Sequence, residues 1–305
     1  MHRPAPAVKA LSHILLRDGA VTVGLAPECG CLTRLDVRAG GRLVEILRPA
    51  SERYADTLWA LGASSFPMLP YCGRLREGRF QFRGRSYRFP LNALPERHSS
   101  HGDAWTRRWE LTRLDHRSAV ITLAEDPSST IRYECTQEIS VIGNRVEFVF
   151  AMRNPGPESI PMGVGIHPYF ANRSLATIRA RLPLRWELDR ELMPVAAREN
   201  PNAPALSRGQ RVVQLPVVGE YAGWDGTATI EWPKLGVEAR IESSPPLKHA
   251  VMWVPEGEDF FCFEPTSHAT DALNGYQGHA PGEGFVTLEP RGLYVQRFAI
   301  VVAVH

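Results

Sequence analysis

Short segments of alternating apolar and polar residues recur along the chain, and they constrain the fold more than any other feature. The clearest are residues 20–25, 79–82, 86–89, 134–141, 145–150, 227–232, 237–242 and 293–304. A period of two is typical of β-strands, and Gly143-Asn144 between two of these segments favours a tight hairpin. Helical periodicity is scarce, and we expect one short helix over residues 54–61.

The number and spacing of these segments predict an all-β protein. Many short strands with frequent turns are typical of a β-sandwich or a β-barrel. The chain has no repeat of fixed period, no low-complexity segment and no stretch that resembles a linker, because its Pro and Gly residues are spread over the whole length. We therefore expect residues 1–305 to form a single β-domain, large enough for a substantial core.

Composition restricts the classes of partner and compartment. The net charge is +2 with acidic and basic residues well mixed, which gives no electrostatic argument for a nucleic-acid partner. No stretch approaches the ~20 apolar residues of a membrane-spanning helix, and the first residues lead into no secretory signal. The five cysteines are scattered and odd in number, so we expect them to be reduced. These features predict a cytoplasmic protein without a membrane partner.

One carboxylate lies inside an aromatic run at residues 260–265, Phe-Phe-Cys-Phe-Glu-Pro. In a strand, Cys262 and Glu264 would face one side, and the phenylalanines next to them would face the other. We expect Pro265 to end the strand, which would place Glu264 at a strand end near the mouth of a site. Aromatic neighbours reduce the hydration of a carboxylate and raise its proton affinity. Glu264 is therefore a candidate base, although an edge-strand Glu bonded to a loop has the same pattern.

Arginines are concentrated after a Pro-Tyr loop. Six of them fall between Arg74 and Arg88, and four of these belong to a predicted hairpin, where they are most simply solvated. Arg74 differs because it follows Pro70-Tyr-Cys-Gly73 and precedes the hairpin. Its guanidinium group could bond hydroxyl or carboxylate oxygens of a ligand through a fixed fork of donors.

Two histidines, His98 and His101, lie in a loop that ends at Trp105. Their spacing is weak support for a metal, for which His167 would be the only obvious third ligand. In the alternative interpretation, His101 donates a hydrogen bond to a ligand and Trp105 supplies a stacking surface. We expect no metal, and a metal-dependent enzyme built on the three histidines stays as an alternative.

A further segment, Gly163-Val-Gly-Ile-His167-Pro-Tyr169-Phe, places a histidine directly before a proline. Histidine is the side chain best suited to proton transfer near neutral pH. A lone His in an apolar strand is more often a core residue. Here, however, His167 and Glu264 each lie next to a Pro at a predicted strand end, as a two-residue acid/base site on a β-scaffold would require.

These segments, in this order, resemble the aldose 1-epimerase (galactose mutarotase) family. That family has a Pro-Tyr-x-Asn-Arg loop before a Gly-Arg-Phe strand, then Leu-His-Gly, then Gly-x-His-Pro-Tyr-Phe. Its last motif is an aromatic-rich Cys-x-Glu-Pro-x-x-His, here Cys262-Phe-Glu264-Pro-Thr-Ser-His268. The resemblance extends from about residue 19 to the C-terminus. It implies a large antiparallel β-sandwich of the galactose mutarotase-like supersandwich type, with a sugar cleft on a concave face.

The resemblance also implies roles for individual residues. Glu264 would be the general base and His167 the general acid, with Glu264 ionised and His167 protonated at working pH. Arg74 and His101 would hold sugar hydroxyls, and Tyr169 is a further expected substrate-binding residue. Mutarotation involves no redox step and no covalent intermediate, so we expect no cofactor.

Two departures from the family pattern bear on the substrate. The family's Asn-Arg pair is Gly73-Arg74 here. The Asp that the family places before its Phe-x-Gly-Trp-Asp-Gly run falls at Val218, and Glu220 and Asp225 are the nearest carboxylates that could replace it. We expect Asp225 to bind substrate. A site that bonds a hydroxyl can discriminate strongly through it, so the substrate preference depends on this substitution.

The predicted function is aldose 1-epimerase (mutarotase) activity on a free aldose, by general acid/base opening and reclosure of the ring. One alternative is a non-catalytic sugar-binding or regulatory protein, which the loss of the Asp at position 218 favours. Another is a hexose-6-phosphate 1-epimerase, which would need extra cations that the arginines after Arg74 could supply. We expect a monosaccharide as the partner and a monomer or weak homodimer as the oligomeric state.

Overall fold

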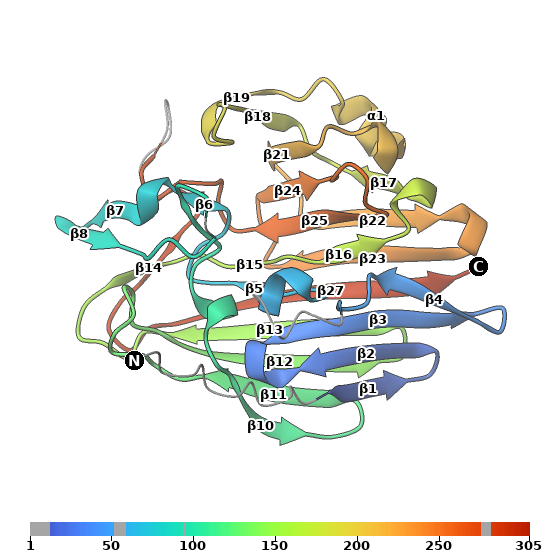
Figure 1. Cartoon of the computed structure of the whole chain (residues 1–305), viewed down its shortest axis with the longest axis horizontal. Helices are drawn as coiled ribbons and strands as arrows, with labels where there is room; N and C mark the ends of the chain where they lie inside the picture. Colours follow the sequence, from blue (N-terminus) through green and yellow to red (C-terminus); the bar gives the residue numbers. More distant parts are fainter. Residues whose placement is uncertain (1–12, 52–58, 94, 276–281) are drawn as a thin grey trace, which may run out of the picture.

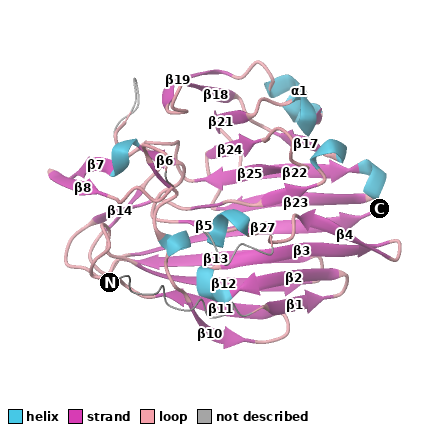
Figure 2. Ribbon diagram, in the orientation of Figure 1, coloured by secondary structure: helices cyan, strands magenta, loops and turns pink. Residues whose placement is uncertain are grey.

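Antiparallel strands dominate the structure, and the helices are short and peripheral (Figure 2). The structure, a computed structural model, describes residues 13–51, 59–93, 95–275 and 282–305. Over these residues no helix has the length and apolar character that a membrane crossing requires. The predicted all-β class is confirmed.

The larger sheet has twelve strands among the described residues. They are β1 (Ile14–Asp18), β2 (Val21–Ala26), β3 (Cys31–Ala39), β4 (Arg42–Leu47), β5 (Pro67–Met68), β15 (Gly165–Ile166), β16 (Tyr169–Ala171), β18 (Leu184–Leu188), β19 (Pro194–Glu199), β21 (Val218–Ala222), β24 (His249–Trp253) and β25 (Phe260–Thr266). Their main order is β1-β2-β3-β4-β16-β25-β24-β21-β18-β19, and β15 joins β25 and β5 beside this path (Figure 1).

The smaller sheet has nine strands in the same part of the chain. They are β10 (Glu110–Leu114), β11 (Ser118–Leu123), β12 (Glu134–Ile142), β13 (Arg145–Arg153), β17 (Thr177–Ala180), β20 (Gln210–Arg211), β22 (Thr227–Trp232), β23 (Val237–Ser244) and β27 (Leu293–Val304). Their order is β10-β11-β12-β13-β27-β23-β22-β17-β20, so the last strand of the chain lies in the middle of this sheet.

Short two-stranded ribbons and single helical turns connect the two sheets. The ribbons pair β14 (Ile160–Met162) with β26 (Val286–Leu288), β6 (Arg74–Leu75) with β9 (Ser99–Ser100), and β7 (Arg79–Phe82) with β8 (Arg85–Arg88). The helices are α1 (Ala203–Arg208) and the 3-10 turns η1 (Pro27–Cys29), η2 (Trp59–Gly62), η3 (Arg76–Gly78), η4 (Ala104–Thr106), η5 (Arg173–Leu175), η6 (Val212–Gln214) and η7 (Pro233–Leu235).

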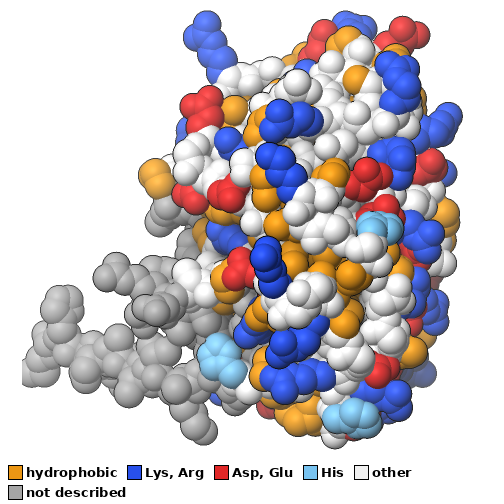
Figure 3. Space-filling model, turned by 90° about the vertical axis from the view of Figure 1, so that its right-hand side faces the viewer, with side chains coloured by type: hydrophobic (Ala, Val, Ile, Leu, Met, Phe, Trp, Pro, Cys, Tyr) orange, Lys and Arg blue, Asp and Glu red, His pale blue; other side chains and the backbone are white. Residues whose placement is uncertain are grey.

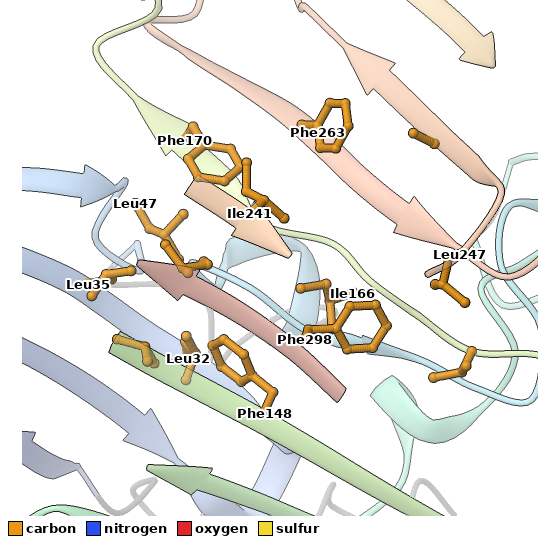
Figure 4. Close-up of a cluster of buried hydrophobic side chains, with 14 of the residues drawn as sticks. Leu32, Leu35, Leu47, Phe148, Ile166, Phe170, Ile241, Leu247, Phe263 and Phe298 are labelled. Atoms are coloured by element: carbon orange, nitrogen blue, oxygen red, sulfur yellow. The ribbon is translucent and has the colours of Figure 1, made fainter. Parts of the chain in front are cut away.

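The core lies between the inner faces of the two sheets. Leu47 and Phe170 from the larger sheet belong to the same buried cluster as Phe148 and Phe298 from the smaller sheet (Figure 4). Side chains of opposite sheets interdigitate in this way in a β-sandwich, which leaves the outer face of each sheet for solvent or for a site. The expected large antiparallel β-sandwich is therefore what the chain forms.

The predicted strands agree closely with the structure. Segments 79–82, 227–232 and 293–304 coincide with β7, β22 and β27, and segment 86–89 is displaced by one residue as β8. Gly143 and Asn144 form the turn of a hairpin in which Ile142 pairs with Arg145. Of the helix expected over residues 54–61, the part from residue 59 onward belongs to η2, and residues 54–58 lie outside the described part of the chain.

Strand β25 corrects one prediction, because it continues through Pro265 to Thr266. The amide of Ser267 donates to the carbonyl of Val164, so the backbone groups of Ser267 face the β15 side. Every second residue of a strand faces the same neighbour, and Pro265 therefore also faces β15. Since Gly165 pairs with Thr266, Pro265 lies opposite the last residue of β15, where that ladder is already ending. The missing N–H therefore removes little pairing. Glu264 consequently lies in the middle of the sheet and not at a strand end.

Candidate active site

A cleft of about 490 Å³ lies on the outer face of the larger sheet. In β25 the side chains alternate as predicted, with Phe261 and Phe263 in the core between the sheets and Glu264 on the opposite face. The neighbouring strands β24 and β21 alternate in the same way. The side chains that line the cleft from the sheet are Val218, Glu220, Val251, Trp253 and Glu264.

The two residues predicted to exchange protons meet at the floor of this cleft. Nε2 of His167 lies 3.3 Å from Oε1 of Glu264. Both side chains are buried, with 5% and 3% of their surfaces exposed. His167 directly follows β15, and its amide donates to the carbonyl of Phe66 at 3.0 Å, which fixes its backbone beside β25. An imidazole and a carboxylate are therefore held together where water has little access.

Burial sets the protonation of this pair. Loss of hydration raises the pKa of Glu264 to about 8, and the neighbouring Glu220 carboxylate adds to the rise. Loss of hydration also lowers the pKa of His167 well below its usual range, and His101 adds to that shift. At neutral pH the pair thus holds one proton, on the carboxyl, with the imidazole neutral. This is the opposite of the charge states expected from the sequence.

Aromatic rings pack closely around the imidazole of His167. The centroids of the Phe66 and Tyr169 rings each lie 4.6 Å from it, and His101 approaches edge-on at 5.3 Å. The Arg48 guanidinium lies 3.8 Å from the Tyr169 ring centroid. Contacts of this kind contribute roughly 0.5–1.5 kcal/mol each beyond their buried area. The predicted ligand Tyr169 does line the cleft, but it is 2% exposed and chiefly orients His167.

His101 lines the cleft with a defined tautomer. The amide of Gly73 donates to Nδ1 of His101 at 3.2 Å, so the ring proton is on Nε2. Burial, with Arg74 nearby, lowers the pKa of His101 to about 3, and the ring is neutral. The loop depends on Gly102, whose φ is +69°, because a Cβ there would lie 1.8 Å from the carbonyl oxygen of Leu69. His101 is therefore a neutral ring whose Nε2–H is available to donate, and its contact with a ligand hydroxyl stays a prediction.

Arg74 also lines the cleft, on the short strand β6. It pairs with Ser100 of β9, which joins the arginine loop to the His101 loop. Its Nε lies 3.8 Å from a carboxylate oxygen of Glu96, and 29% of its side chain is exposed. A guanidinium group in this position can still direct donors into the cleft, and the role of Arg74 in substrate binding stays a prediction.

Residues that follow Glu264 in the sequence brace the arginine loop. Nε2 of His268 accepts from the amide of Cys72 at 3.1 Å, and Oδ1 of Asp271 accepts from the amide of Arg76 at 2.9 Å. The amide of Asp271 donates in turn to the carbonyl of Arg74. One continuous segment thus supplies the carboxylate predicted to act as the base and the contacts that position the arginine, which explains the spacing of this motif.

Comparison with known proteins assigns the chain to a family. The sequence profile of aldose 1-epimerases matches residues 12–299. The chain belongs to the aldose 1-epimerase family. The uncharacterized Escherichia coli K12 protein YphB is 29% identical to it over 272 residues, which are 82% of this chain and 92% of that protein.

Solved structures of epimerase-family proteins share the fold. A proposed aldose 1-epimerase of Escherichia coli K12 superposes with a TM-score of 0.86 and 25% identity, over 97% of this chain and all of that one. A galactose mutarotase-like protein of Clostridium acetobutylicum gives a TM-score of 0.83 at 17% identity, over 97% and 96% of the two chains. The predicted galactose mutarotase-like fold is therefore shown.

Glu220 and Asp225, the two carboxylates that could replace the family's Asp at position 218, lie in different places. Val218 and Glu220 both line the cleft from β21. Asp225 does not: after Ala222 the chain leaves the larger sheet for β22 of the smaller one, and Asp225 lies in a separate groove beside Arg145. It is exposed, and its Oδ1 accepts from the amide of Thr227 in a local turn. Asp225, expected as a substrate ligand, is thus outside the site.

Of the three histidines considered for a metal, His101 and His167 both line the cleft, and His98 does not. His98 is buried, and its Nδ1 accepts from the amide of Glu77. In the described part of the chain, the group of three side chains with ligand atoms within 4.8 Å is His167, Cys262 and Glu264. This group differs from the predicted one, and burial raises the pKa of the Cys262 thiol well above its usual range, which disfavours the thiolate that binds metals.

Several residues of the cleft were missed by the sequence analysis. Arg48 and Trp253 line it, as does Thr270, whose amide donates to Oε1 of Glu220. Arg48 had a signal, because it directly precedes a proline, as His167 and Glu264 do. Trp253 and Thr270 had none, because their approach depends on pairing between distant segments.

Proposed function

We propose that this member of the aldose 1-epimerase family is a mutarotase that interconverts the α and β anomers of a free aldose. The observation that carries the proposal is the buried pair of His167 and Glu264, 3.3 Å apart at the floor of the cleft. A volume of about 490 Å³ is within the range of small-ligand sites. The other polar groups of the cleft suit an uncharged polyol.

Ring opening transfers two protons at the anomeric centre. Glu264 takes the proton of the anomeric hydroxyl, the bond between C1 and the ring oxygen breaks, and His167 protonates that oxygen. The product is an open-chain aldehyde. Rotation about the C1–C2 bond presents the opposite carbonyl face, and the reverse transfers close the ring as the other anomer. A positioned acid and base contribute typically 10²–10⁴-fold.

The pKa directions of the pair fit one half of this cycle. Opening requires an ionised Glu264 and a protonated His167, and it leaves a protonated Glu264 beside a neutral His167. The second state is the one that burial favours at neutral pH. Both states contain one shared proton, so the pair returns to its starting state after each turnover. Burial therefore favours the arrangement from which the ring recloses.

Anomer interconversion, followed by polarimetry or NMR, tests the proposal. Freshly dissolved α-glucose, α-galactose and other aldoses are tested with wild type, Glu264→Gln and the control Glu110→Gln, which changes an exposed carboxylate on edge strand β10 of the other sheet. We expect wild type and the control to accelerate the reaction, and Glu264→Gln to lose at least about 10²-fold while still binding sugar.

Two outcomes would redirect the proposal. Comparable turnover by Glu264→Gln removes Glu264 from its assigned role. A folded wild-type protein that accelerates no aldose, yet binds one, is instead the sugar-binding protein of the alternative prediction. Fold and family membership alone are compatible with that outcome.

The arginines that suggested the hexose-phosphate alternative give it little support. Arg79, Arg83, Arg85 and Arg88 belong to the β7–β8 hairpin and do not line the cleft. Arg48 is a cation of the cleft that the sequence argument did not consider. The same assay with glucose 6-phosphate decides the matter, and a larger kcat/KM than for glucose would favour the phosphorylated substrate.

A further inference from the structure

Glu220 is a buried carboxyl of the cleft that the proton transfers do not use. Only 3% of it is exposed. Across the sheet it pairs with Val251, and Val251 pairs with Glu264, so the two glutamates lie in one row. The two strands that carry them are about 10 Å apart, which is twice the spacing of paired strands. Val251 forms the floor between them, and a pyranose ring with its hydroxyls fills such a gap.

The Glu220 carboxyl is held in place from the loop after β25. The amide of Thr270 donates to Oε1 of Glu220, and the Thr270 hydroxyl interacts with the same carboxyl. This anchoring from a backbone amide fixes the orientation of the carboxyl and leaves capacity for a ligand hydroxyl. Arg74, which follows Gly73 and also lines the cleft, adds a favourable charge.

Gly73 is the residue that makes room for Thr270. A Cβ at Gly73 would lie 2.1 Å from Oγ1 and 3.2 Å from Cα of Thr270, and the φ of Gly73 is +69°. No side chain fits at position 73 while Thr270 occupies this place. The departure noted in the sequence at position 73 therefore makes room for the residue that holds Glu220.

We propose that Glu220, held by Thr270 against Gly73, is the specificity-determining residue of the cleft and bonds the sugar hydroxyl at C3 or C4, across the ring from the anomeric centre. The inference rests on the proposed function, since Glu264 orients C1. A carboxylate at position 218 would lie in the row of Trp253 and Cys262, about 6.7 Å along the strand. Glu220 thus selects a different hydroxyl from a carboxylate at 218, and the substrate is an aldopyranose that offers it.

A double-mutant-type cycle, in which residue 220 and the sugar hydroxyl are each changed alone and together, tests the assignment. The best aldose and its 3-deoxy and 4-deoxy analogues are measured with wild type, Glu220→Gln and the control Glu110→Gln, whose exposed carboxylate lies on the other sheet. We expect wild type and the control to lose about 10²-fold or more in kcat/KM with one deoxy analogue. Glu220→Gln loses about 10- to 100-fold with the parent sugar and little more with that analogue.

Binding, measured by calorimetry for the same sugars and proteins, separates this inference from the proposed function. The inference is supported if wild type binds the parent sugar more tightly than one deoxy analogue and Glu220→Gln does not. This holds even if no protein accelerates anomer exchange and the mutarotase proposal fails. Turnover by wild type with equal deoxy penalties in wild type and Glu220→Gln overturns the role of Glu220 alone. Absence of binding and turnover with every aldose overturns both.

Discussion

Glu220 and Glu264 are two carboxyls that lose most of their hydration in the same cleft. Burial raises the pKa of the first to about 7 and that of the second to about 8. The histidines beside them, His101 and His167, have lowered pKa values and are neutral. Burial thus favours the uncharged form of each of these four side chains, because each charged form would lose its hydration.

The alkaline limit of activity should report the proton on Glu264. Above pH 8 the pair has lost its shared proton, so no acid remains and kcat/KM falls. The acid limit of kcat/KM should lie well below pH 6.5, because the pKa of His167 is lowered. In Glu220→Gln the alkaline limit moves to lower pH, since the removed charge raised the pKa of Glu264. Initial rates from pH 5 to 9.5, corrected for the spontaneous reaction, provide the measurement, and an unmoved limit would contradict it.

The stability of the protein should carry the same signature. The pKa of Glu264 is raised on folding, so its contribution to stability is full below about pH 4.5 and declines as the pH rises through 8. Glu264→Gln cannot ionise. Its free energy of unfolding, relative to wild type, should therefore increase by about 2–5 kcal/mol between pH 4.5 and 9. Urea unfolding at both pH values tests this, and the exposed control Glu96→Gln should show no comparable change.

At the scale of elements, strands with one buried face could be predicted from the sequence, and very short strands could not. β12 and β13 alternate over nine residues each, and their side-chain pattern identifies them. Strands β5, β6, β9 and β15 are two residues long and exist because a distant segment pairs with them. Their local sequences carry no period to detect.

The site divides in the same way. Glu264, His167, Arg74 and His101 could be found because each lies in a short motif with a chemical reason for its residue type. Asp225 was assigned wrongly because a carboxylate near the right sequence position belongs to the other sheet. Two residues close in the sequence can lie on different sheets when the chain crosses from one sheet to the other between them.

The hydrogen bond that His268 accepts from the arginine loop and the packing of the His268 ring should have separable effects. In His268→Leu the buried amide of Cys72 loses its acceptor, which costs about 1–3 kcal/mol. The loop that carries Arg74 should loosen and raise KM. His268→Gln retains an acceptor and should lose less stability and little substrate affinity. Urea unfolding and mutarotation kinetics of both variants test this, and equal losses would show that stacking on Phe285 matters more than the hydrogen bond.

At the scale of the whole molecule, the open edges of the two sheets decide whether copies pair. Strand β10 is exposed at every residue, and its pairing with β11 shifts between Leu111 and Arg113. Strand β19 is an edge of the larger sheet and begins with Pro194. Irregular pairing, charges and proline all oppose edge-to-edge association. On the face seen in Figure 3, Lys and Arg side chains are interspersed with Asp and Glu.

We therefore expect the protein to be mainly a monomer at micromolar concentration. Sedimentation velocity over a hundredfold concentration range provides the measurement, with one species of about 34 kDa as the expected result. The irregular β10 edge opposes pairing through its backbone, and the net charge of +2 adds only a little repulsion. A stable dimer at low concentration would instead show that an outer face of the sandwich is buried.

The pair proposed to transfer protons and the loops proposed to bind the sugar lie on different parts of the molecule. Glu264 lies in the interior of a twelve-stranded sheet, whereas Arg74 and His101 stand on loop segments tied together by two residue pairs. Loops accept insertions and substitutions that interior strands do not. A combinatorial library that varies those two loops together with position 220 should therefore change the accepted sugar while leaving the proposed acid/base pair intact, and the chain would then serve as a scaffold for designing biocatalysts.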